Sequence, residues 1–96
     1  MLEEELRKSL VVSYLGILKT KAFGHSVELR VPPIGAIQCI EGPVHRRGTP
    51  SAVIEMDAKT FISLAIGEIS WAEGVSNGSI RASGERADLT AYLPLI

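Results

Sequence analysis

The sequence predicts an α+β fold, because helical and strand periodicities follow one another along a chain that suits a single core. Leucine or tyrosine recurs every four residues from Leu2 to Leu18, as on one side of an amphipathic helix. From residue 27 the apolar period changes to two, as on a strand with one buried face. Helix-capping signals then follow at Asp57 and Ser70. Ninety-six residues fit one domain, so residues 1–96 are taken as a single domain.

The first half of the chain predicts one long helix and three strands. The helix is expected from Leu2 up to a stop at Gly24, because glutamates lie at its start and lysines near its end, where the helix dipole favours them. Gly24 offers a left-handed stop. Strands are expected over residues 27–31, 36–40 and 52–56, each bounded by proline, glycine or polar residues.

The second half predicts two capped helices, a short strand and a closing helical turn. Asp57 is the expected N-cap of a helix that ends at Gly67. Its apolar residues span about 200° of a helical wheel, so it must contact two other parts of the molecule. A capping box at Ser70 opens a short helix, residues 79–83 predict a strand, and residues 85–93 predict a helical turn or two. Positive φ angles are expected at Gly67, Gly78 and Gly84.

Composition excludes several classes of function. Ten basic and eleven acidic residues give a net charge of −1, which predicts no steering toward nucleic acid. No apolar run reaches the roughly 20 residues that span a bilayer, and three early glutamates do not fit an export signal, so we expect a cytoplasmic protein without stable membrane insertion. The apolar share of 46% is high for one small core. The surplus is expected to meet a ligand or a second subunit.

The order of these signals resembles the sterol carrier protein family. A strand leads into the Asp57-capped helix, and a short helix, Gly78, a strand over residues 80–83, Gly84 and a closing apolar helix follow. Segments 48–50, 71–72 and 82–89 are similar to the bacterial version of the domain, which also resembles the C-terminal domain of mycothiol-dependent maleylpyruvate isomerases. The chain is shorter than typical eukaryotic members, and its end, Leu95-Ile96, carries no peroxisomal address.

This resemblance implies a mixed, mostly antiparallel sheet of about four to five strands, with helices packed on one face around an apolar tunnel. In family members that tunnel accepts fatty acyl chains, acyl-CoA or sterols. The leading hypothesis is therefore non-enzymatic binding or carriage of an apolar lipid-type ligand: fatty acyl, acyl-CoA or isoprenoid. The candidate pocket residues are Phe61, Leu64, Ala65, Trp71, Val75, Ile80, Leu89, Tyr92, Leu93 and Leu95. Each of them also fits ordinary core.

The alternative hypothesis is an accessory or interaction domain with a collapsed pocket, whose surplus apolar surface forms a homodimer or supports a separate enzyme. A third class, a small thiol enzyme, would require a reactive Cys39, which instead lies in an expected buried strand. His25 and His45 lack the spacing of metal ligands, so no metal, cofactor or catalytic residue is expected. The run His45-Arg46-Arg47 fits either a head-group contact or a solvated turn.

Overall fold

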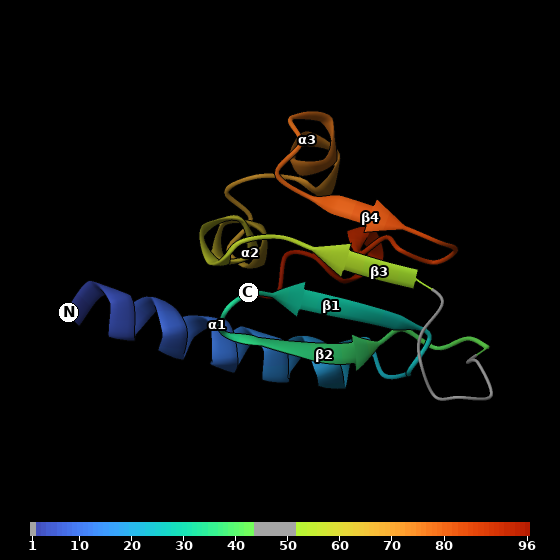
Figure 1. The fold of residues 1–96 in the computed structure, drawn as a ribbon, viewed down its shortest axis with the longest axis horizontal. Coiled ribbons are helices and arrows are strands. Elements are labelled where there is room, and N and C mark those ends of the chain that lie inside the picture. Colours follow the sequence, from blue (N-terminus) through green and yellow to red (C-terminus); the bar gives the residue numbers. More distant parts are fainter. Residues whose placement is uncertain (1, 44–51) are drawn as a thin grey trace.

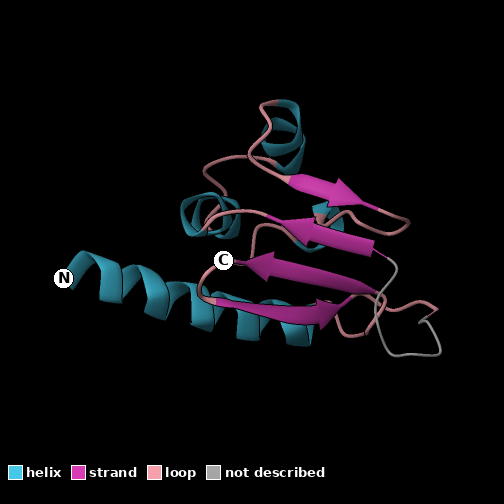
Figure 2. Cartoon of the chain, in the orientation of Figure 1, coloured by secondary structure: helices cyan, strands magenta, loops and turns pink. Residues whose placement is uncertain are grey.

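The structure is a computed structural model that describes residues 2–43 and 52–96 (Figure 1). The expected turn His45-Arg46-Arg47 and segment 48–50 lie outside the described residues. The elements follow the predicted order (Figure 2). They are α1 (Leu2–Lys21), β1 (Val27–Val31), β2 (Gly35–Cys39), β3 (Ala52–Glu55), α2 (Ala58–Ala65), α3 (Trp71–Ser76), β4 (Arg81–Ser83) and a 3-10 turn, η1 (Thr90–Tyr92).

The four described strands form one mixed sheet in the order β2-β1-β3-β4. β1 pairs antiparallel with β2 and parallel with β3, and β3 pairs antiparallel with β4. This confirms the expected α+β class with a mixed, mostly antiparallel sheet. The sheet is open at both ends of that order, so its two edges are β2 and β4.

The two faces of the sheet differ as the alternation in β1 predicts. Val27, Leu29 and Val31 are fully buried, whereas Glu28 and Arg30 between them point to the other face and reach solvent. On that polar face Glu28 pairs with Arg30. The helices therefore pack on one face only, and the core lies between them and the sheet.

α1 covers the sheet with its C-terminal two thirds. Val11, Leu15 and Leu18 are buried in the core, and Tyr14 lies at its edge. Leu6, which belongs to the same expected stripe, is 58% exposed. Figure 1 shows why: the N-terminal turns of α1 project beyond the sheet, so no strand lies beneath them. The expected stripe is thus buried only where the sheet extends under it.

Both predicted helix starts are confirmed. The Asp57 carboxylate accepts a hydrogen bond of 2.8 Å from the backbone N–H of Thr60. At α3, Ser70 Oγ accepts from Glu73 N (3.1 Å), while Glu73 Oε1 accepts from Ser70 N (2.8 Å), which completes the capping box. The expected positive φ angles also occur, at Gly67 (80°), Gly78 (83°) and Gly84 (92°).

The helical turn or two expected over residues 85–93 is shorter than predicted, because only the three-residue turn η1 is helical there. Arg86 has a positive φ of 67°, which is incompatible with continuing a right-handed helix. The backbone N–H of Asp88 donates to the Arg86 carbonyl (2.8 Å), and the Asp88 carboxylate then accepts from Thr90 N (2.7 Å). The chain therefore turns twice before the tail begins.

Candidate functional site

An apolar cleft lies between the end of α2, the start of α3 and the C-terminal tail. Its volume is about 300 Å³, and it is open to solvent on one side. We call it the tail cleft, and its lining residues are Leu64, Gly67, Ile69, Ser70, Trp71, Glu73, Thr90, Leu93 and Pro94. Local structure explains the shape: Gly67 ends α2 with a positive φ, and the capping box at Ser70 starts α3 three residues later.

One wall of the tail cleft is the C-terminal tail, and three hydrogen bonds hold that tail in place. The backbone N–H groups of Leu95 and Ile96 donate to the Ala65 carbonyl at 2.8 and 3.3 Å. Ala65 is the last residue of α2, so its carbonyl has no partner within the helix. From the other side, Lys21 Nζ at the end of α1 donates to the Pro94 carbonyl (3.1 Å). The tail thus bridges two helix ends.

The structure brings only part of the predicted pocket set to this cleft. Leu64, Trp71 and Leu93 line it. Leu64 and Trp71 are also part of the buried core. Four other candidates are buried in that core without lining the cleft: Phe61, Ala65, Ile80 and Leu89. Tyr92 and Leu95 are partly buried and pack against that core. Val75 lies on the outer side of α3 and is 45% exposed.

Six lining residues were not among the sequence-based candidates: Gly67, Ile69, Ser70, Glu73, Thr90 and Pro94. Three of them, Gly67, Ser70 and Glu73, carry signals that indicate local structure only, namely a helix stop and a capping box. Their clustering around one opening depends on the tail folding back to Ala65. A capping signal flanked by apolar residues on both sides is the sequence feature that points to such a rim.

The polar rim of the tail cleft carries negative charge. Glu73 is the one charged residue among its lining residues. Its pKa is lowered by the hydrogen bonds that it accepts from the backbone and makes with the side chain of Ser70, so it stays ionised at neutral pH. No basic side chain of the described residues lines this cleft. A ligand carboxylate placed beside Glu73 would therefore meet a like charge, whereas the Lys21 ammonium contacts the Pro94 carbonyl on the tail side.

Cys39 has none of the surroundings of a nucleophile. Its side chain is fully buried, and burial raises the pKa of the thiol to about 11, so it stays protonated at neutral pH. The His25 ring is 3.0 Å from the Gln38 side-chain oxygen. Across residues 2–43 and 52–96, no three His, Cys, Asp or Glu side chains lie close enough to share a metal ion. The His45 contribution lies outside the described residues.

Fold and cleft together define a small α+β domain with an apolar opening between α2, α3 and the C-terminal tail. A family model described as bacterial SCP ortholog, SCP standing for sterol carrier protein, matches residues 4–95. Because the match spans nearly the whole chain, the chain belongs to this family, as the resemblance predicted. The comparison with curated proteins finds no relative that matches. In the part of the chain that the structure describes, no helix is both long and apolar enough to cross a membrane.

Proposed function

We propose that this protein binds and carries an apolar lipid-type ligand, without catalysing a reaction on it, and that the tail cleft is where the ligand enters. Membership of the sterol-carrier-like family supports lipid binding in general. The observation that carries the proposal for this chain is an apolar opening with the tail as one wall. Hydrogen bonds to the two helix ends and the packing of Leu93 and Leu95 against the core hold that tail in place.

The size of the cleft sets how much ligand it holds. Small-molecule sites measure about 300–1,000 Å³, so 300 Å³ lies at the lower end of that range. With about 30 Å³ for one water in the liquid, the cleft has room for roughly ten groups of that size. A longer chain requires the tail to move away from Ala65, which would open the way to the buried residues Phe61 and Leu89 beneath.

The charge of the rim narrows the ligand class. Glu73 at the mouth disfavours a fatty acid that enters with its carboxylate near the rim. An isoprenoid or acyl chain that enters with its apolar end, with its head group outside, avoids this repulsion. Among fatty acyl, acyl-CoA and isoprenoid ligands, we therefore favour those with an uncharged group at the rim.

Trp71 offers a direct test, because it is the single tryptophan of the chain and lines the cleft. Titration with a long-chain alcohol is expected to shift its fluorescence with saturation, and the matching fatty acid is expected to bind more weakly. Native mass spectrometry of the freshly purified protein, with denaturing extraction, identifies any ligand carried from the cell. A protein that is empty and shows no fluorescence change with alcohol, acid or acyl-CoA would refute the proposal.

Two variants separate the cleft from a general apolar surface. Leu93→Ala removes part of one wall, and the loss of a side-chain contact worth about 1.4 kcal/mol weakens binding roughly tenfold. Val75→Ala removes an exposed side chain from the same helix as Trp71, outside the cleft, and is expected to leave binding unchanged. Equal losses in both variants would argue against the cleft as the binding site.

A further inference from the structure

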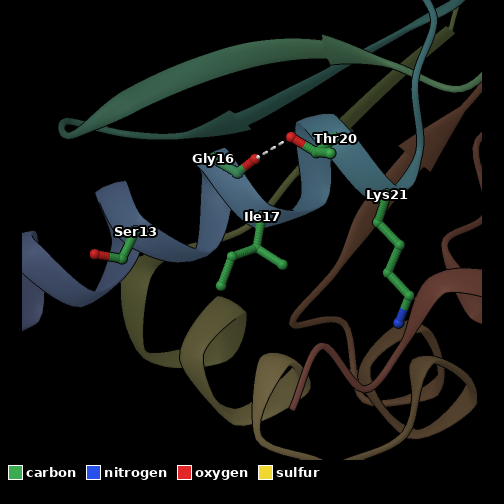
Figure 3. A pocket seen from close by; sticks show the side chains of 5 residues that line it. All are labelled: Ser13, Gly16, Ile17, Thr20 and Lys21. Atoms are coloured by element: carbon green, nitrogen blue, oxygen red, sulfur yellow. Dashed lines mark hydrogen bonds between the residues drawn. The ribbon is translucent and has the colours of Figure 1, made fainter.

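One side of α1 is largely exposed and carries apolar, small and hydroxyl side chains without a charge between residues 6 and 20. Leu6 and Ile17 on this side are 58% and 43% exposed, although α1 is a core helix. A shallow groove of about 680 Å³ on this side is lined by Ser13, Gly16, Ile17, Thr20 and, at its end, Lys21 (Figure 3). We call this side the α1 flank, and its residues are Leu6, Ser9, Leu10, Ser13, Gly16, Ile17 and Thr20. At 100° per residue they fall within about 120° of one another, next to the buried stripe.

Gly16 on the α1 flank is not explained by contacts within the chain. A glycine inside a helix is destabilising relative to alanine, and a conserved fold tolerates it where another backbone comes close. In this chain a Cβ at Gly16 would meet nothing within 4 Å among the described residues. Packing among the described residues therefore does not explain why position 16 is a glycine. The close approach of a helix from another molecule would explain it.

The distribution of charge along α1 indicates which kind of helix can pack against the flank. Its first turn carries Glu3, Glu4 and Glu5, and its last turn carries Lys19 and Lys21. A second α1 that lies antiparallel across the flank sets each acidic end against a basic end. A parallel arrangement sets like charges together, which is unfavourable. The helix is thus complementary to its own reversed copy.

We propose that two copies of this chain associate through their α1 flanks, antiparallel, with a two-fold axis at Ser13. Under that symmetry, a residue of one copy faces the residue of the second copy that lies equally far from Ser13 in the opposite direction, so the two residue numbers add up to about 26. On one side of the axis Leu10 then packs against Ile17 of the second copy. On the other side Ser9 faces Gly16, so the two backbones approach closely where both side chains are small. This association is independent of what the tail cleft binds.

A membrane surface fits the same flank less well. Interfacial helices carry lysine and arginine along the polar face, whereas α1 has glutamates in its first turn and lysines only in its last. The α1 helix has 20 residues, about 30 Å, so a strip about 10 Å wide offers roughly 300 Å² from each partner. This is below the ~800 Å² of a standard interface, and the dimer is expected to be weak and concentration-dependent.

Sedimentation velocity over a wide range of protein concentration tests the association. Ile17→Glu places a charge in the centre of the flank and is expected to weaken the dimer at least tenfold. Val12→Glu is the matched control, because Val12 is 56% exposed and lies about 140° from Ile17 around the same helix, outside the flank. A wild-type protein that stays monomeric throughout, or equal effects of both variants, would overturn the proposal.

Cross-linking tests the orientation. Ser13→Cys lies at the proposed axis, where two copies bring its Cα atoms close to disulfide distance. Thr20→Cys lies seven residues from the axis on each copy, which separates the two thiols by about 20 Å in the antiparallel arrangement. Rapid oxidation to a dimer for Ser13→Cys and not for Thr20→Cys is expected. Equal cross-linking would overturn the antiparallel pairing, and loss of vesicle binding by a monomeric Ile17→Glu would assign the flank to a membrane instead.

Gly16→Ala gives a result of opposite sign for the monomer and the dimer. The added methyl group meets open space in one chain, so the thermal midpoint of the dilute protein is expected to rise. In the dimer the same methyl group holds the two backbones apart, so the dissociation constant is expected to increase several-fold. An unchanged or tighter dimer would contradict the close approach at this position.

Discussion

The helix boundaries at the two ends of the helical layer are fixed by different kinds of interaction. At α2 and α3, Asp57 and Ser70 cap helices through contacts three residues away in the sequence. At the end of α1, Gly24 packs directly on the backbone of Ile40, sixteen residues later. Ile40 N donates to the Ala22 carbonyl (2.7 Å), and the Ile40 carbonyl accepts from Ser26 N (3.0 Å) and Ser26 Oγ (2.6 Å).

We call the contact between residues 22–26 and Ile40 the α1 junction. It contains backbone strain that the capped starts of α2 and α3 lack. Ile40 is buried with a φ of 65°, which a β-branched residue rarely adopts. Such a conformation persists only where the surroundings determine it fully, here through three hydrogen bonds and the contact with Gly24. Each local cap therefore contributes to the free energy of unfolding separately. At the α1 junction, by contrast, the loss of one contact is expected to disrupt the others as well.

The largest effect is expected from Gly24→Ala. The new methyl group would overlap the Ile40 carbonyl and the Glu41 nitrogen, which are backbone atoms and cannot move alone. Gly24 also has a positive φ of 144°. Overpacking together with this strain is expected to cost about 3 kcal/mol of the free energy of unfolding, measured by urea titration.

Gly78→Ala is the matched control for that substitution. Gly78 has a positive φ of 83°, but a methyl group there meets nothing within 4 Å among the described residues. Only the backbone strain remains, about 1 kcal/mol. If both variants lose the same free energy, steric overlap with Ile40 does not hold the α1 junction together.

A smaller effect is expected when one cap is removed. Asp57→Ala leaves the Thr60 N–H without its acceptor and is expected to lower stability by about 1 kcal/mol. Asp57→Asn keeps an acceptor oxygen, and asparagine is an equally good N-cap, so it is expected to lose much less. Thermal unfolding of the two variants measures the difference. Equal losses would mean that the charge of Asp57, rather than its hydrogen bond, stabilises α2.

The capped end of the layer, unlike the α1 junction, is expected to weaken in acid. The pKa of Asp57 is lowered mainly by the hydrogen bond from Thr60 N, and that of Glu73 by the one from Ser70 N. Both folded values lie below the ordinary 3.8 and 4.5. The stability from these groups is therefore present above those values and is lost as the pH falls through the folded ones. Asp57→Asn should show a shallower acid loss, and an unchanged acid profile would contradict the assignment.

The smallest effect on stability is expected at the contact between α1 and the tail. Lys21→Met removes the exposed hydrogen bond to the Pro94 carbonyl, and an exposed bond of this kind is worth less than about 1 kcal/mol. The tail cleft, however, loses one of the three bonds that hold its wall. Ligand dissociation, followed through Trp71 fluorescence, is expected to become faster while the unfolding midpoint hardly changes. The opposite pattern would show that the contact is structural only.

The sequence predicts this fold wherever a local pattern decides the outcome. The period-two alternation of Val27, Leu29 and Val31 places them on the buried face, and both helix caps form as expected. The closing helical turn is shorter than predicted because Arg86 adopts a positive φ, which no propensity indicates for arginine. The left-handed Ile40 is equally invisible in the sequence, since contacts with Ala22, Gly24 and Ser26, after the end of α1, impose it.

The candidate site is predicted less completely, for the same reason. Leu64, Trp71 and Leu93 have apolar side chains at helical or tail positions that sequence reasoning selects. Phe61 and Leu89 satisfy the same criterion and are buried like Leu64 and Trp71, but they do not line the cleft. What distinguishes the two groups is the path of the tail back to the Ala65 carbonyl, a contact across 30 residues. Apolar character alone does not report such a contact.

The parallel pairing of β1 with β3 has a consequence for the order of folding. The β1–β2 hairpin closes between Val31 and Gly35, so its loop is short and its entropy cost is small. The β1–β3 register joins Val27 to Ala52, and β4 joins β3 across Val53 and Ser83. Long-range pairings of this kind form slowly. We therefore expect the N-terminal hairpin to assemble first and the tail cleft last, so that a nascent or partly unfolded chain has its hairpin before it has a place for a ligand.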